Sequence, residues 1–121
     1  MTSKVEYAQV EPYVTLDGSR VRELMHPRAH GNQAQSLAEA IVNVGQATRL
    51  HRHLKTEELY HFTSGEGTMT LGDEVFAVKQ GDTVCIPPGM PHRVQNTGRT
   101  PLKILCCSTP PYADSDTELL D

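Results

Sequence analysis

The sequence predicts an all-β fold, a sandwich or barrel of roughly eight or nine short strands. Two observations support this prediction: 9 Gly and 8 Pro are spread among apolar runs of a few residues, and helical periodicity is nearly absent. The chain has 121 residues, of which 37% are hydrophobic, so it can enclose one core. It shows no internal repeat, low-complexity stretch or linker, and we expect a single domain over residues 1–121.

Apolar runs bounded by Gly, Pro, Asn or Asp mark the expected strands. These are residues 13–15, 21–25, 37–44, two strands within 46–62, then 68–71, 75–78, 83–86, 92–95 and 102–108. Turn chemistry at 17–18 and 72–74 predicts two hairpins, and the polar segment 27–35 is expected to be a loop.

The acidic tail, residues 112–121, has Leu119 and Leu120 as its only apolar anchor, and we expect it to be partly ordered at best. Cys85 and Cys106 are expected to be small buried strand residues.

The charge pattern argues against large anionic partners. The formal charge is -4, and the 11 Lys and Arg are scattered, whereas nucleic acids and anionic membranes select a basic cluster. No apolar run approaches the roughly 20 residues of a membrane span, and residues 1–10 lack the pattern of a secretory signal. The 3 Cys include no CxxC pair, which indicates a reducing compartment. We therefore expect a cytoplasmic protein without nucleic-acid or membrane partners.

Histidines and glutamates form the most informative cluster. His51 and His53 are two positions apart in an expected strand, so both side chains point to the same face. Glu57 and Glu58 follow closely, and His92 begins a later strand. Imidazoles with a carboxylate suit Fe, Mn, Ni, Co or Zn as divalent ions. Each piece alone has an ordinary explanation, a surface His pair or a solvated turn, so the combination carries the hypothesis.

Strand alternation bears on the choice between the two glutamates. Glu58 shares a face with Tyr60 and Phe62, and Glu57 lies on the opposite face. A carboxylate beside two aromatic rings is typical of a ligand-binding interior, which favours Glu58 as the inward residue.

Arg49 and Tyr60 are the two candidate catalytic residues. Arg49 has the same parity as His51, so it either points inward as an anion anchor or forms a surface salt bridge at the rim. Tyr60 either donates a proton or hydrogen bond to a substrate or serves only as part of the barrel wall.

Ten residues fall at the spacings of the two motifs of the cupin family. The first motif, G-x5-H-x-H-x4-E-x6-G, matches over 45–65 at Gly45, His51, His53, Glu58 and Gly65. The second, G-x5-P-x-G-x2-H-x3-N, matches over 81–96 at Gly81, Pro87, Gly89, His92 and Asn96. With 15 residues between the motifs, the chain resembles small single-domain type-2 cupins, including the phosphomannose isomerase-like and polyketide-synthesis-like groups.

The resemblance implies a double-stranded β-helix (jelly-roll) barrel. Inside it, His51, His53, Glu58 and His92 would hold one divalent transition metal. Because this set leaves coordination positions open, we expect a metalloenzyme acting on a small organic molecule by isomerase, cyclase, lyase or dioxygenase chemistry.

Two alternatives to an enzyme remain: a non-catalytic binding or sensing cupin, and a structural barrel that the metal only stabilises. The resemblance also implies a homodimer, with residues 5–16 placed to contribute to the interface.

Overall fold

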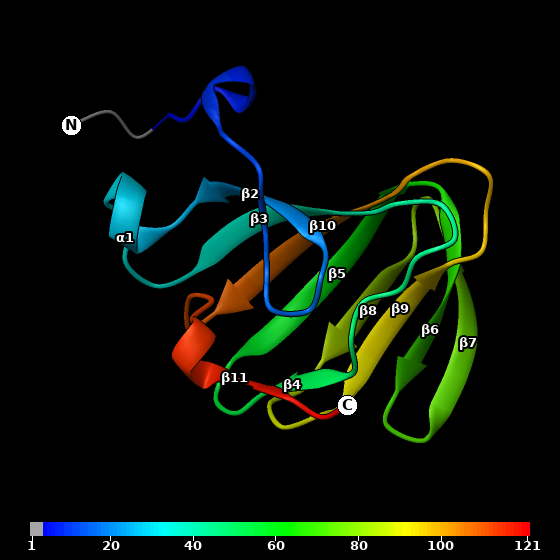
Figure 1. Cartoon of the computed structure of the whole chain (residues 1–121). Helices are drawn as coiled ribbons and strands as arrows, with labels where there is room; N and C mark the ends of the chain where they lie inside the picture. Colours follow the sequence, from blue (N-terminus) through cyan, green and yellow to red (C-terminus); the bar gives the residue numbers. More distant parts are fainter. Residues whose placement is uncertain (1–3) are drawn as a thin grey trace.

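The computed structural model describes residues 4–121, whose strands form two antiparallel sheets that face each other (Figure 1). The first sheet has the order β1-β2-β3-β10-β5-β8 and the second β11-β4-β9-β6-β7. The strands are β1 (Tyr13–Val14), β2 (Arg20–Met25), β3 (Ser36–Val42), β4 (His51–His53), β5 (Glu57–Ser64), β6 (Glu66–Leu71), β7 (Glu74–Lys79), β8 (Thr83–Ile86), β9 (His92–Asn96), β10 (Leu102–Thr109) and β11 (Thr117–Leu119). The predicted all-β jelly-roll barrel is confirmed.

Both predicted hairpins are present. β1 pairs with β2 across the turn at residues 17–18, and β6 pairs with β7 across the turn at 72–73. Gly65 adopts φ +88°, and a Cβ added there would lie 2.8 Å from the carbonyl oxygen of Pro101. The chain can therefore pass this point only with a glycine.

Short helices were not predicted. The expected loop 27–35 contains α1 (Pro27–His30), and 3-10 turns occur at η1 (Tyr7–Gln9) and η2 (Asp114–Asp116). His26 caps α1 by accepting a hydrogen bond from the backbone N–H of Arg28. A single helical turn shows no periodicity, so the pattern of residues could not predict it. None of the helices within residues 4–121 has the length and apolar character that a membrane span requires.

The barrel interior changes character along its length. The inward side chains of β5 are Glu58, Tyr60 and Phe62, and this predicted alternation is confirmed by their burial. Phe62 packs at the apolar end with Met69 and other fully buried side chains, whereas Glu58 lies at the polar end. The core therefore fills one end of the barrel and leaves the other for polar groups.

The C-terminal tail is ordered, so the expectation of partial order is wrong. β11 pairs with β4 and extends the second sheet, as the red segment beside β4 shows (Figure 1). The carboxylate of Asp116 accepts hydrogen bonds from the backbone N–H groups of Lys55 and Thr56, and Asp121 binds Arg49. Backbone pairing and charged side chains hold the tail, and β11 is a strand that was not predicted.

The cysteines differ from one another in exposure. Cys106 is buried as predicted, but Cys85 is exposed, so that prediction is wrong. β8 lies at the edge of its sheet, and its alternation turns Cys85 outward and Ile86 inward.

Candidate metal centre

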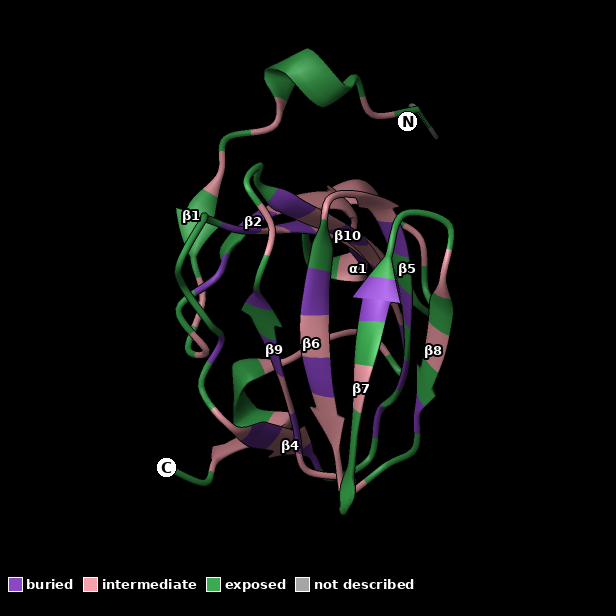
Figure 2. Cartoon of the chain, turned by 90° about the vertical axis from the view of Figure 1, so that its right-hand side faces the viewer, coloured by how far each residue is buried: buried purple, intermediate pink, exposed green. Residues whose placement is uncertain are grey.

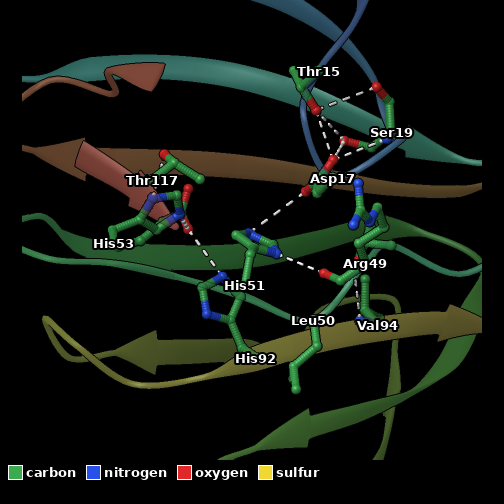
Figure 3. A network of polar contacts seen from close by, with 12 residues as sticks. Thr15, Asp17, Ser19, Arg49, Leu50, His51, His53, His92, Val94 and Thr117 are labelled. Carbon is green, nitrogen blue, oxygen red and sulfur yellow. Dashed lines mark hydrogen bonds and ion pairs between the residues drawn. The ribbon is translucent and has the colours of Figure 1, made fainter. Parts of the chain in front are cut away.

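Three imidazoles meet at the polar end of the barrel (Figure 3). His51 and His53 project from the same face of β4, and His92 is directly opposite His51 in the β4–β9 pair. All three are buried, and one ring nitrogen of each lies within 4.8 Å of the others. This cluster could hold a metal ion.

The outer nitrogens of these rings are fixed by hydrogen bonds. His51 Nδ1 is 2.7 Å from the carbonyl oxygen of Arg49, and His92 Nδ1 is 2.9 Å from that of Met90. His53 Nδ1 is 3.0 Å from the hydroxyl of Thr117, which itself donates to a backbone carbonyl. Since these partners accept, each Nδ1 carries the proton and each Nε2 offers a lone pair to the interior, the tautomer that metal binding requires.

Glu58 completes the cluster. Its Oε1 lies 3.2 Å from His53 Nε2 and 3.7 Å from His92 Nε2, while Ser108 donates to its Oε2 at 3.3 Å. Among the described residues, Glu58 Oε1 and His92 Nε2 are both buried without a hydrogen-bond partner. A divalent cation would satisfy both atoms at once, so the donor set fits a metal.

The electrostatics of the cluster also suit a cation. Burial, and next the neighbouring His51, lower the pKa of His92 to about 4, so its imidazole is neutral at pH 7. Burial lowers the pKa of His53, but the adjacent carboxylate of Glu58 outweighs burial, and the net shift is upward. Positive charge is therefore stabilised beside Glu58.

Tyr60 lies inside the barrel, with its ring centroid 5.9 Å from that of His92. Burial, and then the charge of Glu58, raise the pKa of Tyr60 well above its ordinary value. Its hydroxyl therefore stays protonated and can donate a hydrogen bond to a molecule in the barrel.

Arg49 lies at the surface. Its guanidinium donates to the side chain of Asp121 at 3.1 Å and to the backbone oxygen of the same residue at 2.7 Å. Of the two alternatives considered for Arg49, the structure shows the surface ion pair and not the inward anion anchor. Glu57 is also exposed.

A cavity of about 40 Å³ adjoins the cluster. This is room for roughly three water-sized groups. Its walls include His51, His53, Glu58 and Tyr60, together with Asp17 and Glu23. A small ligand in this cavity would lie directly beside the histidine nitrogens.

Sequence reasoning did not identify Asp17, Glu23 and Thr117 as part of the site. Asp17 Oδ2 is 3.6 Å from His51 Nε2, yet in the sequence Asp17 has only the signature of a turn residue. Thr117 lies in the tail for which partial order was expected. No local pattern marks any of the three residues, because they reach the site through pairings between distant parts of the chain.

The sequence matches the family model described as "Cupin domain" over residues 38–108. An uncharacterized protein of Methanocaldococcus jannaschii is 55% identical over 98% of this chain and 94% of its own length. The oxalate-binding protein of Thermotoga maritima is 30% identical over 68% of each chain.

Solved structures give the same architecture. A predicted oxalate decarboxylase from Thermotoga maritima superposes with a TM-score of 0.74 at 26% identity, covering 88% of this chain and 97% of that one. The oxalate decarboxylase of Lactobacillus farciminis, as a formate complex, has a TM-score of 0.81 at 24% identity, covering 93% of this chain but 34% of that one. The latter likeness supports the fold alone. The family match, these folds and the buried histidine cluster agree that the chain belongs to the cupin family.

Proposed function

We propose that this protein is a metalloenzyme that acts on a small organic molecule within its barrel, at a divalent transition metal held by His51, His53, Glu58 and His92. The observation that supports this most directly is the pair of buried, unpartnered atoms, Glu58 Oε1 and His92 Nε2, beside a cavity. A structural metal site is normally closed by protein ligands, whereas this one opens onto space for a ligand.

When bound, the metal would supply Lewis acidity toward a substrate oxygen, or a site for O₂ if the ion is iron. The chain's own residues contribute orientation and proton control. Ser108 holds Glu58 in place, the burial of the three histidines keeps bulk water from them, and Tyr60 presents a protonated hydroxyl to the cavity.

A non-catalytic binding protein is the second candidate, favoured by one observation. The Thermotoga maritima relative is named for binding oxalate and not for a reaction. Tight binding of a small molecule without turnover would select this alternative.

Metal analysis of the purified protein tests the site. We expect about one divalent ion per chain in the wild type and its loss in His51→Ala and His92→Ala. The matched control is His61→Ala, because His61 is exposed and bonded to Thr83 away from the cluster. Unchanged metal content in both cluster variants would contradict the proposal.

The reaction class requires a second assay. Oxygen consumption by the Fe(II)-loaded protein with a panel of small acids, thiols and phenols would indicate dioxygenase chemistry. Turnover without O₂ would indicate isomerase, cyclase or lyase chemistry, and binding with no turnover would favour the second candidate.

A further inference from the structure

Apart from the histidines, the charged side chains that line the cavity beside the cluster are carboxylates. Asp17, Glu23 and Glu58 line it, and none of its lining residues within the described chain is Lys or Arg. Arg49 and Arg52, which flank His51 in the sequence, pair instead with Asp121 and Glu118. An anionic ligand would therefore find no Lys or Arg here, and a bound metal would be its main source of attraction.

Asp17 directs one carboxylate oxygen at the Nε2 atom of His51. Its Oδ1 accepts hydrogen bonds from the Thr15 hydroxyl at 2.6 Å, the Ser19 hydroxyl at 2.7 Å and the Ser19 backbone N–H at 2.9 Å. These bonds leave Oδ2 free to face His51 Nε2 at 3.6 Å, and Figure 3 shows His51 lying between Asp17 and His92.

The contact between Asp17 and His51 favours a cation. His51 Nδ1 already donates to a carbonyl, so a neutral ring presents the Nε2 lone pair to the carboxylate, which is repulsive unless positive charge lies nearby. Asp17 and Glu58 together would neutralise a divalent ion, whereas Glu58 alone would leave one positive charge to attract an anion.

Glu23 has a carboxylate oxygen that can accept a hydrogen bond from a ligand. Its Oε1 accepts from the Tyr13 hydroxyl at 2.9 Å, but its Oε2 is buried with no partner in the part of the chain that the structure describes. A ligand hydroxyl, amide N–H or ammonium would satisfy this atom, and a carboxylate would be repelled by it.

We infer that the cavity selects an uncharged or cationic ligand that donates hydrogen bonds, and that Asp17 is the residue that determines this specificity by placing a second carboxylate at the metal. The inference rests on the proposed metal site and narrows its substrate class. Oxalate, the ligand for which the Thermotoga relative is named, is a dianion and would be disfavoured.

Two ligands of matched shape test the inference. Glycolamide and glycolate differ in charge but hardly in size, and each can be titrated into the Co(II)-loaded protein while the visible absorption of the cobalt is recorded. At an effective dielectric of about 20, a carboxylate some 5 Å from an anion weakens binding by tenfold or more. We expect the wild type to favour glycolamide by about that factor, and Asp17→Asn and Glu23→Gln to reduce the preference.

A direct readout of Asp17 is the affinity for Co(II) itself. Competition with a chelator should show at least about tenfold weaker binding in Asp17→Asn, because a charge-bearing neighbour of the ion is lost. Asp73→Asn is the matched control, since Asp73 is exposed in the β6–β7 turn.

Every result of these titrations either supports or contradicts the inference about Asp17. Glycolate binding as tightly as glycolamide to the wild type, a cobalt spectrum that glycolamide does not change, or an unaltered preference in Asp17→Asn would overturn the inference. These results would not contradict the proposed metal site. A wild type that binds no Co(II), or a His92→Ala variant that still binds it, would overturn the proposed function as well.

Discussion

At the residue scale, the candidate site is organised by the proton on each imidazole. The three Nδ1 atoms are held by two backbone carbonyls and one hydroxyl, so in the neutral rings the three Nε2 atoms face inward without protons. Of these partners, only the Thr117 hydroxyl can be removed by a side-chain substitution. Burial, which lowers the pKa of His92, also keeps that ring available as a neutral ligand.

The pKa of His92 predicts a pH dependence for the metal-free protein. Its value is about 4 in the folded state, against 6.5 ordinarily, because burial disfavours the imidazolium. Between these values the unfolded chain binds more protons, so the free energy of unfolding falls as pH drops from 6.5 toward 4. The loss approaches about 3 kcal/mol at most.

Thermal denaturation at pH 7 and pH 4.5 checks this prediction. We expect metal-free wild type to lose more melting temperature between the two pH values than His92→Gln, which cannot be protonated there. The raised pKa of His53 acts in the opposite sense, giving stability at low pH that is lost as pH rises, so the comparison with the variant isolates His92. Equal losses in the two proteins would refute it.

At the scale of elements, the site depends on the pairing of β11 with β4. β4 has three residues, and two of them are candidate ligands. It pairs with β9 at His51 and with β11 along its whole length. The C-terminal strand therefore holds the backbone from which His51 and His53 project, and it supplies Thr117 to His53.

Thr117→Val should weaken metal binding without unfolding the protein. The substitution keeps the shape of the side chain but removes the acceptor for His53 Nδ1–H, and loss of such an outer partner costs about ten- to hundredfold in metal affinity. Chelator competition measures the effect. Glu118→Ala is the control in the same strand, because Glu118 pairs with Arg52 outside the barrel. Equal affinity in Thr117→Val and wild type would contradict the positioning role.

At the scale of the whole molecule, the N-terminal segment lies outside the barrel. Figure 2 shows η1 above the two sheets, and Tyr7 contacts the barrel through Glu39 and Arg22. β1 forms the edge of the first sheet, and its Val14 is 67% exposed. An apolar strand edge of this kind needs a cover, which a second copy of the chain would provide.

We therefore predict a homodimer through β1 and the preceding segment. Light scattering coupled to size-exclusion chromatography should give a dimer for the wild type and a monomer for Val14→Asp, because the substitution places charge in the proposed interface. Val75→Asp is the matched control, since Val75 is also 67% exposed but lies on β7, at the edge of the other sheet. A monomeric wild type, or equal dissociation of both variants, would exclude this interface.

Much of the fold and the gathering of the histidines could be predicted because the decisive signals are local. Two histidines two positions apart in a strand must share a face, and the alternation along β5 separates Glu58 from Glu57. The glycines at 45, 65 and 81 adopt the positive φ expected where strands turn. None of these features depends on residues far away in the chain.

Only the tertiary structure decided which other groups reach the cavity. Asp17 meets His51, which lies 34 positions further along the sequence, and Thr117 meets His53 because β11 returns to β4. Arg49 has the parity of the histidines, yet it precedes the first residue of β4 and bonds the last residue of the chain at the surface. Such contacts depend on which strands pair in the sheets and on which of several possible partners gives a side chain the lowest free energy. No local pattern of residues could show them.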